Sequence, residues 1–326
     1  MNNDVILLPL LEINSLTVDY QTRRGNIRAV NNISFNLERG ETLGLVGESG
    51  SGKSTLGFSI IRLVPPPGMI VNGNIRIEGK DILNLSEEEM RSIRGKKVAY
   101  VFQDPMTSLN PIKKVGAHFV ELIRTHEPHV SEKEAFQRAE KAISDVGILP
   151  ERINDYPHQF SGGMRQRIMM ALGIVLDPAL VIADEPTTAL DVIVQAKILD
   201  LLKKIQDTYG MALILITHDL SIVLERCDKI LVMYAGCLVE YASSVELYRN
   251  PRHPYTQGLL KSIPDIDLTE QKLEAIPGVP PNLLNPPKGC QFWPRCSDAK
   301  EKCSAEEPPI VEVSLGHFVR CFGGGI

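Results

Sequence analysis

Short apolar runs alternate with amphipathic stretches through most of the chain. Five runs rich in β-branched residues predict strands, namely Thr42–Val46, Lys97–Phe102, Leu180–Ala183, Ala212–Ile216 and Lys229–Met233. Within Asp191–Tyr209, apolar residues recur at helical spacing, and lysines fall on the opposite side. Strands that alternate with helices in this way predict an α/β fold with parallel strands and crossover helices.

The first part of the chain has a different, two-residue periodicity. Glu12–Tyr20 and Ala29–Leu37 are predicted strands around a turn that contains Gly25 and Asn26, and a second turn is predicted at Asn72–Asn74. These segments predict a small antiparallel β-subdomain ahead of the main sheet.

Residues 105–178 are predicted to be mostly helical and to form an insertion between two core strands. Ser131 followed by Glu134 indicates a capping box, and Arg165–Leu176 is a second predicted helix. The last 76 residues differ again, because they hold 11 of the 22 prolines, four of the six cysteines and the single tryptophan, Trp293. We therefore expect three parts: a core with its β-subdomain (1–104 plus 179–248), a helical subdomain (105–178) and a C-terminal extension (249–326).

The charge balance argues against a nucleic-acid partner. Lys and Arg number 35 against 40 Asp and Glu, which leaves a formal charge of -5 and no long basic block. The apolar runs are shorter than the roughly 20 residues that span a bilayer. The N-terminus has no basic residue ahead of its apolar stretch, so we expect no secretory signal and place the chain in the cytosol.

A glycine-rich segment follows the first core strand and opens a predicted helix. It reads Gly47-Glu-Ser-Gly-Ser-Gly-Lys-Ser-Thr55, which is the phosphate-binding P-loop pattern in its required context. Backbone N–H groups of such a loop turn towards phosphates, and the helix N-terminus favours an anion. We expect Lys53 on the β- and γ-phosphates of ATP and Ser54 on Mg²⁺. The nucleotide-binding residues predicted here are Gly47, Ser49, Gly50, Gly52, Lys53, Ser54 and Thr55. The alternative is a flexible Gly/Ser turn.

Two adjacent carboxylates end the strand that begins at Leu180. Asp184 suits the metal side of a phosphate site, and Glu185 could align or deprotonate an attacking water. A solvated strand end is the alternative, but the P-loop in the same chain favours a catalytic pair.

The segment Phe160-Ser-Gly-Gly-Met-Arg-Gln-Arg167 lies between these motifs and resembles the signature of the ATP-binding-cassette (ABC) superfamily. Ser-Gly-Gly at a helix start is again an anion site. The resemblance implies that Ser161 and Gly163 contact the γ-phosphate bound by an opposite subunit. The resemblance extends to the segment Ala189-Leu-Asp191. It also includes Gln103, directly after one predicted strand, and His218, close to the end of another.

The resemblance also implies individual roles. Gln103 would join Ser54 and Asp184 around Mg²⁺, His218 would contact the γ-phosphate, and Tyr20 would stack on adenine. Taken singly, Gln103 and His218 could be surface or capping residues, and Tyr20 could be a strand tyrosine packed on the β-layer.

A closer resemblance covers the chain from about residue 10 to its end. The segments 102–111, 156–167, 183–191, 253–256, 276–280 and 289–296 look like the ATP-binding subunits of dipeptide and oligopeptide importers. This implies an ATPase that drives peptide import, peripheral on the cytoplasmic face of the cell membrane. Its partners would be a second, identical or homologous ATP-binding subunit, two permease subunits and, indirectly, an extracytoplasmic substrate-binding protein. Nickel and oligosaccharide importers have similar ATPases, and a soluble ABC ATPase acting on ribosomes or DNA is a further alternative.

Four cysteines of the extension have the spacing C-x5-C-x6-C-x17-C, at Cys290, Cys296, Cys303 and Cys321. A reducing compartment favours a metal centre over disulfides. No C-x2–4-C pair typical of zinc is present, whereas four thiolates at irregular spacing can hold a [4Fe–4S] cluster. The resemblance to cluster-bearing members of the family points to the cluster; zinc, and reduced or disulfide-linked cysteines, are the alternatives. Cys227 and Cys237 are interpreted as small packing residues.

Overall fold

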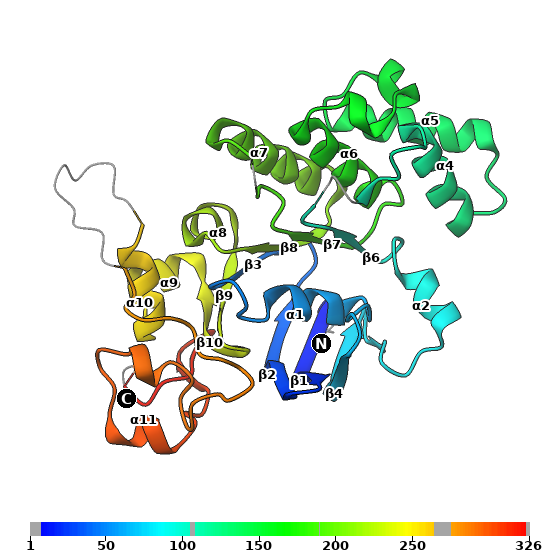
Figure 1. The fold of residues 1–326 in the computed structure, drawn as a ribbon. Coiled ribbons are helices and arrows are strands. Elements are labelled where there is room, and N and C mark those ends of the chain that lie inside the picture. Colours follow the sequence, from blue (N-terminus) through cyan, green and yellow to red (C-terminus); the bar gives the residue numbers. More distant parts are fainter. Residues whose placement is uncertain (1–7, 105–107, 189, 264–274, 324–326) are drawn as a thin grey trace, which may run out of the picture. The chain divides into compact units, whose positions relative to one another are not determined.

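The computed structural model describes residues 8–104, 108–188, 190–263 and 275–323. The chain divides into two compact units. Unit 1 comprises Met1–Leu37, Thr42–Leu83 and Leu215–Ile326, and unit 2 comprises Glu38–Glu41 and Asn84–Ile214. Figure 1 shows both units and labels most of their helices and strands.

Unit 1 contains an antiparallel sheet and most of a second sheet. The strands and helices of its first part are β1 (Leu11–Thr22), β2 (Gly25–Leu37), β3 (Thr42–Val46), α1 (Lys53–Ile60), β4 (Gly68–Ile77) and β5 (Lys80–Asp81). Those of its last part are α8 (Leu220–Arg226), β9 (Lys229–Tyr234), β10 (Cys237–Ser243), α9 (Ser244–Arg249), α10 (Pro254–Lys261), η3 (Trp293–Arg295), α11 (Glu301–Ala305), β11 (Val311–Ser314) and β12 (His317–Val319).

The strand orders in unit 1 are β2-β1-β4-β5 in one sheet and β11-β12-β10-β9-β3 in the other. The first sheet is antiparallel, as predicted for the β-subdomain. In the second, β3 is parallel to β9, and β10 is antiparallel to both β9 and β12. The core strand β3 is buried at every position because both of its faces are covered.

Unit 2 is mostly helical. Its elements are α2 (Glu87–Ile93), β6 (Val98–Val101), α4 (Val115–His126), α5 (Glu132–Asp145), η1 (Pro150–Asn154), η2 (Pro157–Gln159), α6 (Gly162–Ile174), β7 (Leu180–Asp184) and α7 (Val192–Tyr209). β8 (Ala212–Thr217) starts in unit 2 and ends in unit 1. β6 and β7 are parallel, and β7 neighbours β8. The five predicted core strands and the predicted helix over 191–209 are confirmed within one or two residues.

The predicted hairpin of the first two strands is confirmed, but its turn lies at residues 23–24, because Gly25 and Asn26 pair with Thr22 and Gln21 as the first residues of β2. The turn predicted at Asn72–Asn74 is wrong. Asn72–Asn74 lies inside β4, where the pairing with β1 shifts at a bulge. There a Cβ on Gly73 would lie 2.6 Å from the Leu16 Cα, and Gly73 has a φ of 106°. The glycine that suggested a turn therefore serves a close approach of two strands.

Helix starts in unit 2 follow the capping residues. Ser131 accepts a hydrogen bond from the Glu134 N–H at 3.2 Å, which supplies one half of the predicted capping box. The complete reciprocal box is found instead at Ser86 and Glu89, at the start of α2. The predicted helix 165–176 corresponds to α6, which begins earlier because Ser161 caps it.

The C-terminal extension is built onto β9 and β10. β12 pairs with β10 through Glu240 and Tyr241. Phe292 is 3% exposed. Its ring centroid lies 5.1 Å from that of Tyr234 and 5.3 Å from that of Tyr255. These aromatic contacts anchor a segment with little regular structure to the end of β9.

Candidate functional site

The predicted P-loop joins β3 to α1 in unit 1. A Cβ on Gly47 would lie 2.1 Å from the Met233 carbonyl oxygen, and one on Gly52 would lie 2.0 Å from that of Ala29. Gly50 and Gly52 have φ values of 78° and 100°, which L side chains rarely adopt. These glycines are therefore required by close packing and by backbone conformation, and the alternative of an unspecific flexible turn does not account for them.

Lys53 lies at the first position of α1 and is 5% exposed. Its Nζ donates to the carbonyl oxygens of Gly47 at 2.7 Å and Glu48 at 3.0 Å. The ammonium group is thus held against the loop whose N–H groups are predicted to bind phosphate.

Ser51 was not singled out in the sequence, because the motif allows any residue at its position. Its Oγ is buried and has no hydrogen-bond partner among the residues that the structure describes. A buried hydroxyl without a partner is costly, and a phosphate oxygen would satisfy it. The loop therefore fits the anion that its pattern predicts.

Tyr20 lies beside the P-loop within unit 1. Its hydroxyl oxygen is 3.3 Å from Thr55 Oγ1. Its ring covers Gly68 on β4, since a Cβ there would lie 2.7 Å from Tyr20 Cε1. This position next to the loop suits the predicted base-stacking role, although the same ring also packs on the β-layer.

The acidic strand end in unit 2 carries an ordered set of hydrogen bonds. Asp184 is 3% exposed, and its Oδ2 accepts from the Tyr100 hydroxyl at 2.6 Å. Glu185 Oε2 accepts from Gln103 Nε2 at 2.8 Å and from Thr188 Oγ1 at 2.7 Å. The structure thus brings together Gln103 and the predicted catalytic carboxylate.

Glu185 has a φ of 44°, in the left-handed region that glycine favours. Such strain in a non-glycine residue costs of order 1–3 kcal/mol and is concentrated at functional sites. The strained backbone makes Glu185 a candidate functional residue.

Tyr100, in unit 2, has a role at this site that the sequence analysis did not predict. Burial raises its pKa above that of an ordinary tyrosine, and the nearby Asp184 adds to the shift. The phenol therefore remains a donor and orients Asp184. A tyrosine in an apolar strand resembles a packing residue, so the sequence contains no signal for this role.

The signature segment opens α6 on an accessible surface. Ser161 caps the helix, since its Oγ accepts from the Met164 N–H at 3.4 Å. A Cβ on Gly163 would lie 3.0 Å from Val194 Cγ1, at the start of α7. Phe160 is 3% exposed and packs under the Arg152 guanidinium, whose Cζ is 4.2 Å from the ring centroid. The first residue of the signature segment is therefore a packing residue.

Other predicted residues are placed as follows. His218 directly follows β8 and is exposed, and Ser49 is exposed on the P-loop. Residues 105–107 and Ala189, which belong to segments of the family resemblance, lie outside the described residues.

The four cysteines of the extension line one pocket of about 150 Å³. Burial, with a smaller contribution from the other three thiols of the set, raises the pKa of Cys290 to about 11. However, no group of three or more His, Cys, Asp or Glu side chains among the described residues is placed so that it could hold a metal ion. The four predicted ligands thus line one pocket, but the structure shows no formed metal site among the described residues. Cys227 and Cys237 are buried, as expected for packing residues.

The loop, the acidic strand end and the signature helix are the parts of an ABC-type ATPase, and comparison with known proteins agrees. The family described as ABC transporter matches residues 30–188, and that described as oligopeptide/dipeptide transporter, C-terminal region, matches residues 239–303. A dimeric post-hydrolysis structure of an ATP-binding cassette bound to ADP and Pi has a TM-score of 0.65 at 28% identity, over 72% of this chain and 98% of that one.

Two curated relatives narrow the class of ABC-type ATPase further. The oligopeptide transport ATP-binding protein OppD of Bacillus subtilis is 48% identical over 95% of this chain and 88% of its own length. The dipeptide transport ATP-binding protein DppD of Lactococcus lactis is 45% identical over 95% of this chain and 90% of its own length. The chain belongs to this family of oligopeptide and dipeptide transport ATP-binding proteins. The predicted fold class, ATPase class and family are confirmed.

Proposed function

We propose that this chain is the ATP-hydrolysing subunit of an importer that carries dipeptides or oligopeptides across a membrane. The observation that carries the proposal is the presence, in one chain, of a closely packed loop with the P-loop pattern, a carboxylate with a left-handed backbone conformation and a C-terminal region of the oligopeptide/dipeptide transporter type. The relatives named for peptide transport support the cargo class.

In this proposal Lys53 and the N–H groups of the P-loop bind the β- and γ-phosphates. Ser54, Gln103 and Asp184 are the residues that would hold Mg²⁺, directly or through water, and the ion would supply positive charge for the phosphates. Glu185 aligns or deprotonates the attacking water, and His218 contacts the γ-phosphate. Tyr100 keeps the Asp184 carboxylate oriented for this set.

A second cassette completes each site in our proposal, because the chain has one P-loop and one signature segment. The surface beside the signature supports pairing. Val192 and Ile193, in the first turn of α7, are 79% and 68% exposed, and Val194 lies against Gly163. Exposed apolar side chains next to an anion-binding helix start are suited to burial against a partner. The partner is a second copy or a homologous subunit.

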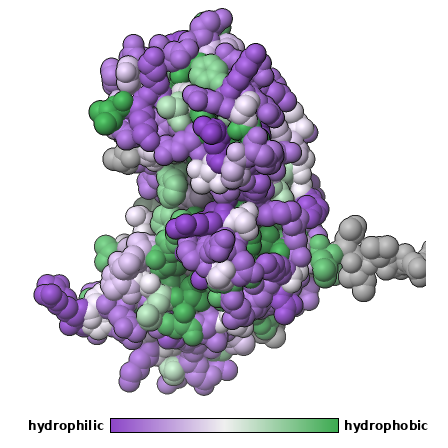
Figure 2. All heavy atoms as spheres, turned by 90° about the vertical axis from the view of Figure 1, so that its right-hand side faces the viewer, coloured by the Kyte–Doolittle hydropathy of each residue, from purple (hydrophilic) through white to green (hydrophobic). Residues whose placement is uncertain are grey.

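We also propose that unit 2 docks on a membrane permease at the cytoplasmic face, and that a substrate-binding protein acts only through that permease. Ile112 and Leu149 of this unit are 82% and 68% exposed. Figure 2 shows one face of the molecule, where hydrophilic residues surround a central area of hydrophobic ones. No helix in the described ranges is long and apolar enough to cross a membrane.

Uptake measurements test the proposed function. In cells that lack this chain, its restoration should recover uptake of labelled dipeptide or oligopeptide, and the chain should be isolated with membranes and a permease. Recovery of nickel or oligosaccharide uptake instead would contradict the cargo assignment. Isolation with ribosomes or DNA would contradict the transport role.

For the extension, we propose that Cys290, Cys296, Cys303 and Cys321 hold a [4Fe–4S] cluster, with zinc as the alternative. The pocket that all four line supports this, and the thiols would have to move closer to form the ligand set. The group would act as a cross-link for a segment with little regular structure.

Metal analysis of the anaerobically purified protein tests this proposal. We expect about four iron and four sulfide ions per chain, lost in Cys303→Ser and kept in the control Cys227→Ser, whose target is a buried packing residue. One zinc ion per chain would contradict the cluster and favour the alternative zinc site. A metal-free protein with four free thiols would refute a metal centre.

A further inference from the structure

The C-terminal extension contacts Glu48 of the phosphate-binding loop. Arg295 Nη1 and Nη2 donate to the two carboxylate oxygens of Glu48 at 2.7 and 3.0 Å. The Tyr255 hydroxyl accepts a hydrogen bond from the Glu48 backbone N–H at 2.9 Å. Residues of the extension thus form hydrogen bonds with both the side chain and the main chain of this loop residue.

Arg295 is itself fixed by its surroundings. Its side chain is 6% exposed, against 27% for that of Glu48. Its Nε donates to the Pro277 carbonyl oxygen at 2.8 Å, and its Nη1 lies 3.3 Å from the Tyr234 hydroxyl. A two-point Arg–carboxylate pair that is this well enclosed has a defined geometry, unlike an exposed ion pair. The residue ends η3, a short turn located between Cys290 and Cys296.

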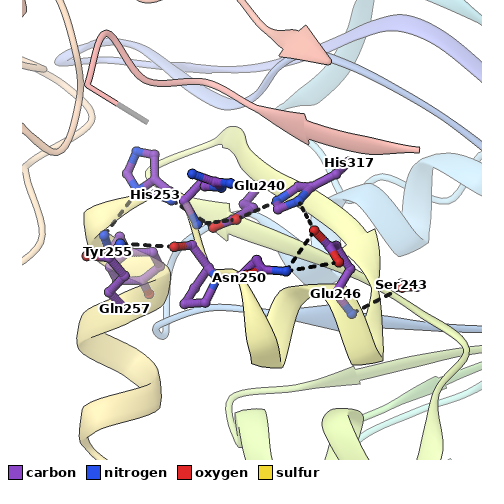
Figure 3. A network of polar contacts seen from close by, with 10 residues as sticks. Glu240, Ser243, Glu246, Asn250, His253, Tyr255, Gln257 and His317 are labelled. Carbon is purple, nitrogen blue, oxygen red and sulfur yellow. Dashed lines mark hydrogen bonds and ion pairs between the residues drawn. The ribbon is translucent and has the colours of Figure 1, made fainter. Parts of the chain in front are cut away.

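Tyr255 is placed by a buried polar network (Figure 3). The Glu240 carboxylate accepts from the N–H groups of Arg252 at 2.7 Å and His253 at 3.0 Å, and His317 Nε2 lies 2.8 Å from it. His253 caps α10, because its Nδ1 accepts from the Tyr255 N–H at 3.1 Å. The hydrogen bond with Glu240 raises the pKa of His317. The first turn of α10, and with it Tyr255, is therefore fixed by a fully buried carboxylate.

On the loop side, Glu48 is also the residue whose main chain holds the phosphate-binding lysine. Its carbonyl oxygen accepts from Lys53 Nζ at 3.0 Å and from the Ser51 N–H at 3.1 Å. An unpaired carboxylate at this position would repel a bound polyphosphate, since two charges of like sign close together in a partly buried site interact strongly. Arg295 cancels that charge and keeps the carboxylate in place.

We propose that Arg295 is a positioning residue for nucleotide binding, which acts by holding and neutralising Glu48, with Tyr255 as the second attachment. The integrity of the cysteine-bearing extension thereby sets the affinity of the P-loop for ATP. The inference rests on the proposed assignment of residues 47–55 as the phosphate-binding loop.

The test compares KM for ATP and kcat in the assembled transporter. Arg295→Ala should raise KM about tenfold and change kcat less than about twofold, because the extension acts on binding and not on the reacting atoms. The double variant Arg295→Ala, Glu48→Gln should recover KM to within about threefold of wild type, because it removes the uncompensated charge. Tyr255→Phe, a milder change, should raise KM about threefold.

The control is Arg138→Ala, which removes a two-point pair with Glu127 and a contact with a backbone carbonyl in unit 2. It should leave KM unchanged. The proposal is overturned if Arg295→Ala leaves KM unchanged, or if the double variant is as impaired as the single one. Lys53→Ala in the same assay separates the two levels: if it weakens binding while Arg295→Ala does not, only this inference fails; if neither does, the P-loop assignment fails as well.

Discussion

Glu185→Gln is expected to lower kcat for ATP hydrolysis about 10²- to 10⁴-fold, the range for loss of a general base. Glutamine has the same shape, and its carbonyl can still accept from Gln103 and Thr188, which now donate to Glu185 at 2.8 and 2.7 Å. The amide cannot take a proton from water. ATP affinity should therefore stay within about threefold of wild type, and ATP should hold two cassettes together.

The control for this variant is Glu121→Gln. Glu121 is an exposed carboxylate of the same unit, and its Oε2 lies 2.8 Å from Lys113 Nζ. We expect wild-type turnover from it, because an exposed ion pair contributes little. Steady hydrolysis near the wild-type rate by Glu185→Gln would show that another group is the main catalytic carboxylate.

Lys53→Ala is expected to weaken ATP binding about 10- to 100-fold, which corresponds to the loss of one charge-assisted hydrogen bond. The carbonyl oxygens of Gly47 and Glu48 hold the ammonium group at the N-terminus of α1. Its removal therefore takes a positive charge from the loop itself. Equilibrium binding of a fluorescent ATP analogue measures the effect.

Lys203→Ala is the matched control, because Lys203 is an exposed lysine of α7 paired with Asp207 at 2.9 Å. It should bind ATP as wild type does. Since Lys53 is buried, the melting temperature of both variants should be compared, and a folded Lys53→Ala protein with unchanged affinity would refute the P-loop assignment.

The sequence predicts the core of this fold well because local signals and burial agree there. β3 is buried at all five positions, and the glycines that follow it are required by close packing and backbone conformation. The turn predicted for the Asn-Gly-Asn stretch at 72–74 is wrong because the same residue types occur in turns and in β-bulges. The pairing of β4 with β1, a non-local contact, decided between them.

What the sequence could not predict depends on contacts between distant residues. Tyr100 looks like any strand aromatic until β6 and β7 pair and place it on Asp184, 84 positions later. The pair of Glu48 with Arg295 joins residues 247 positions apart. No periodicity or motif connects such positions. The contact between the extension and the P-loop becomes visible only in the tertiary structure.

The central claim is that this chain binds ATP through its P-loop and hydrolyses it through Glu185. The most direct test is to incubate the assembled Glu185→Gln transporter with ATP and Mg²⁺ and identify the bound nucleotide by chromatography. The account predicts that intact ATP stays bound while the wild-type complex yields ADP and phosphate. Accumulation of ADP at the wild-type rate would contradict it.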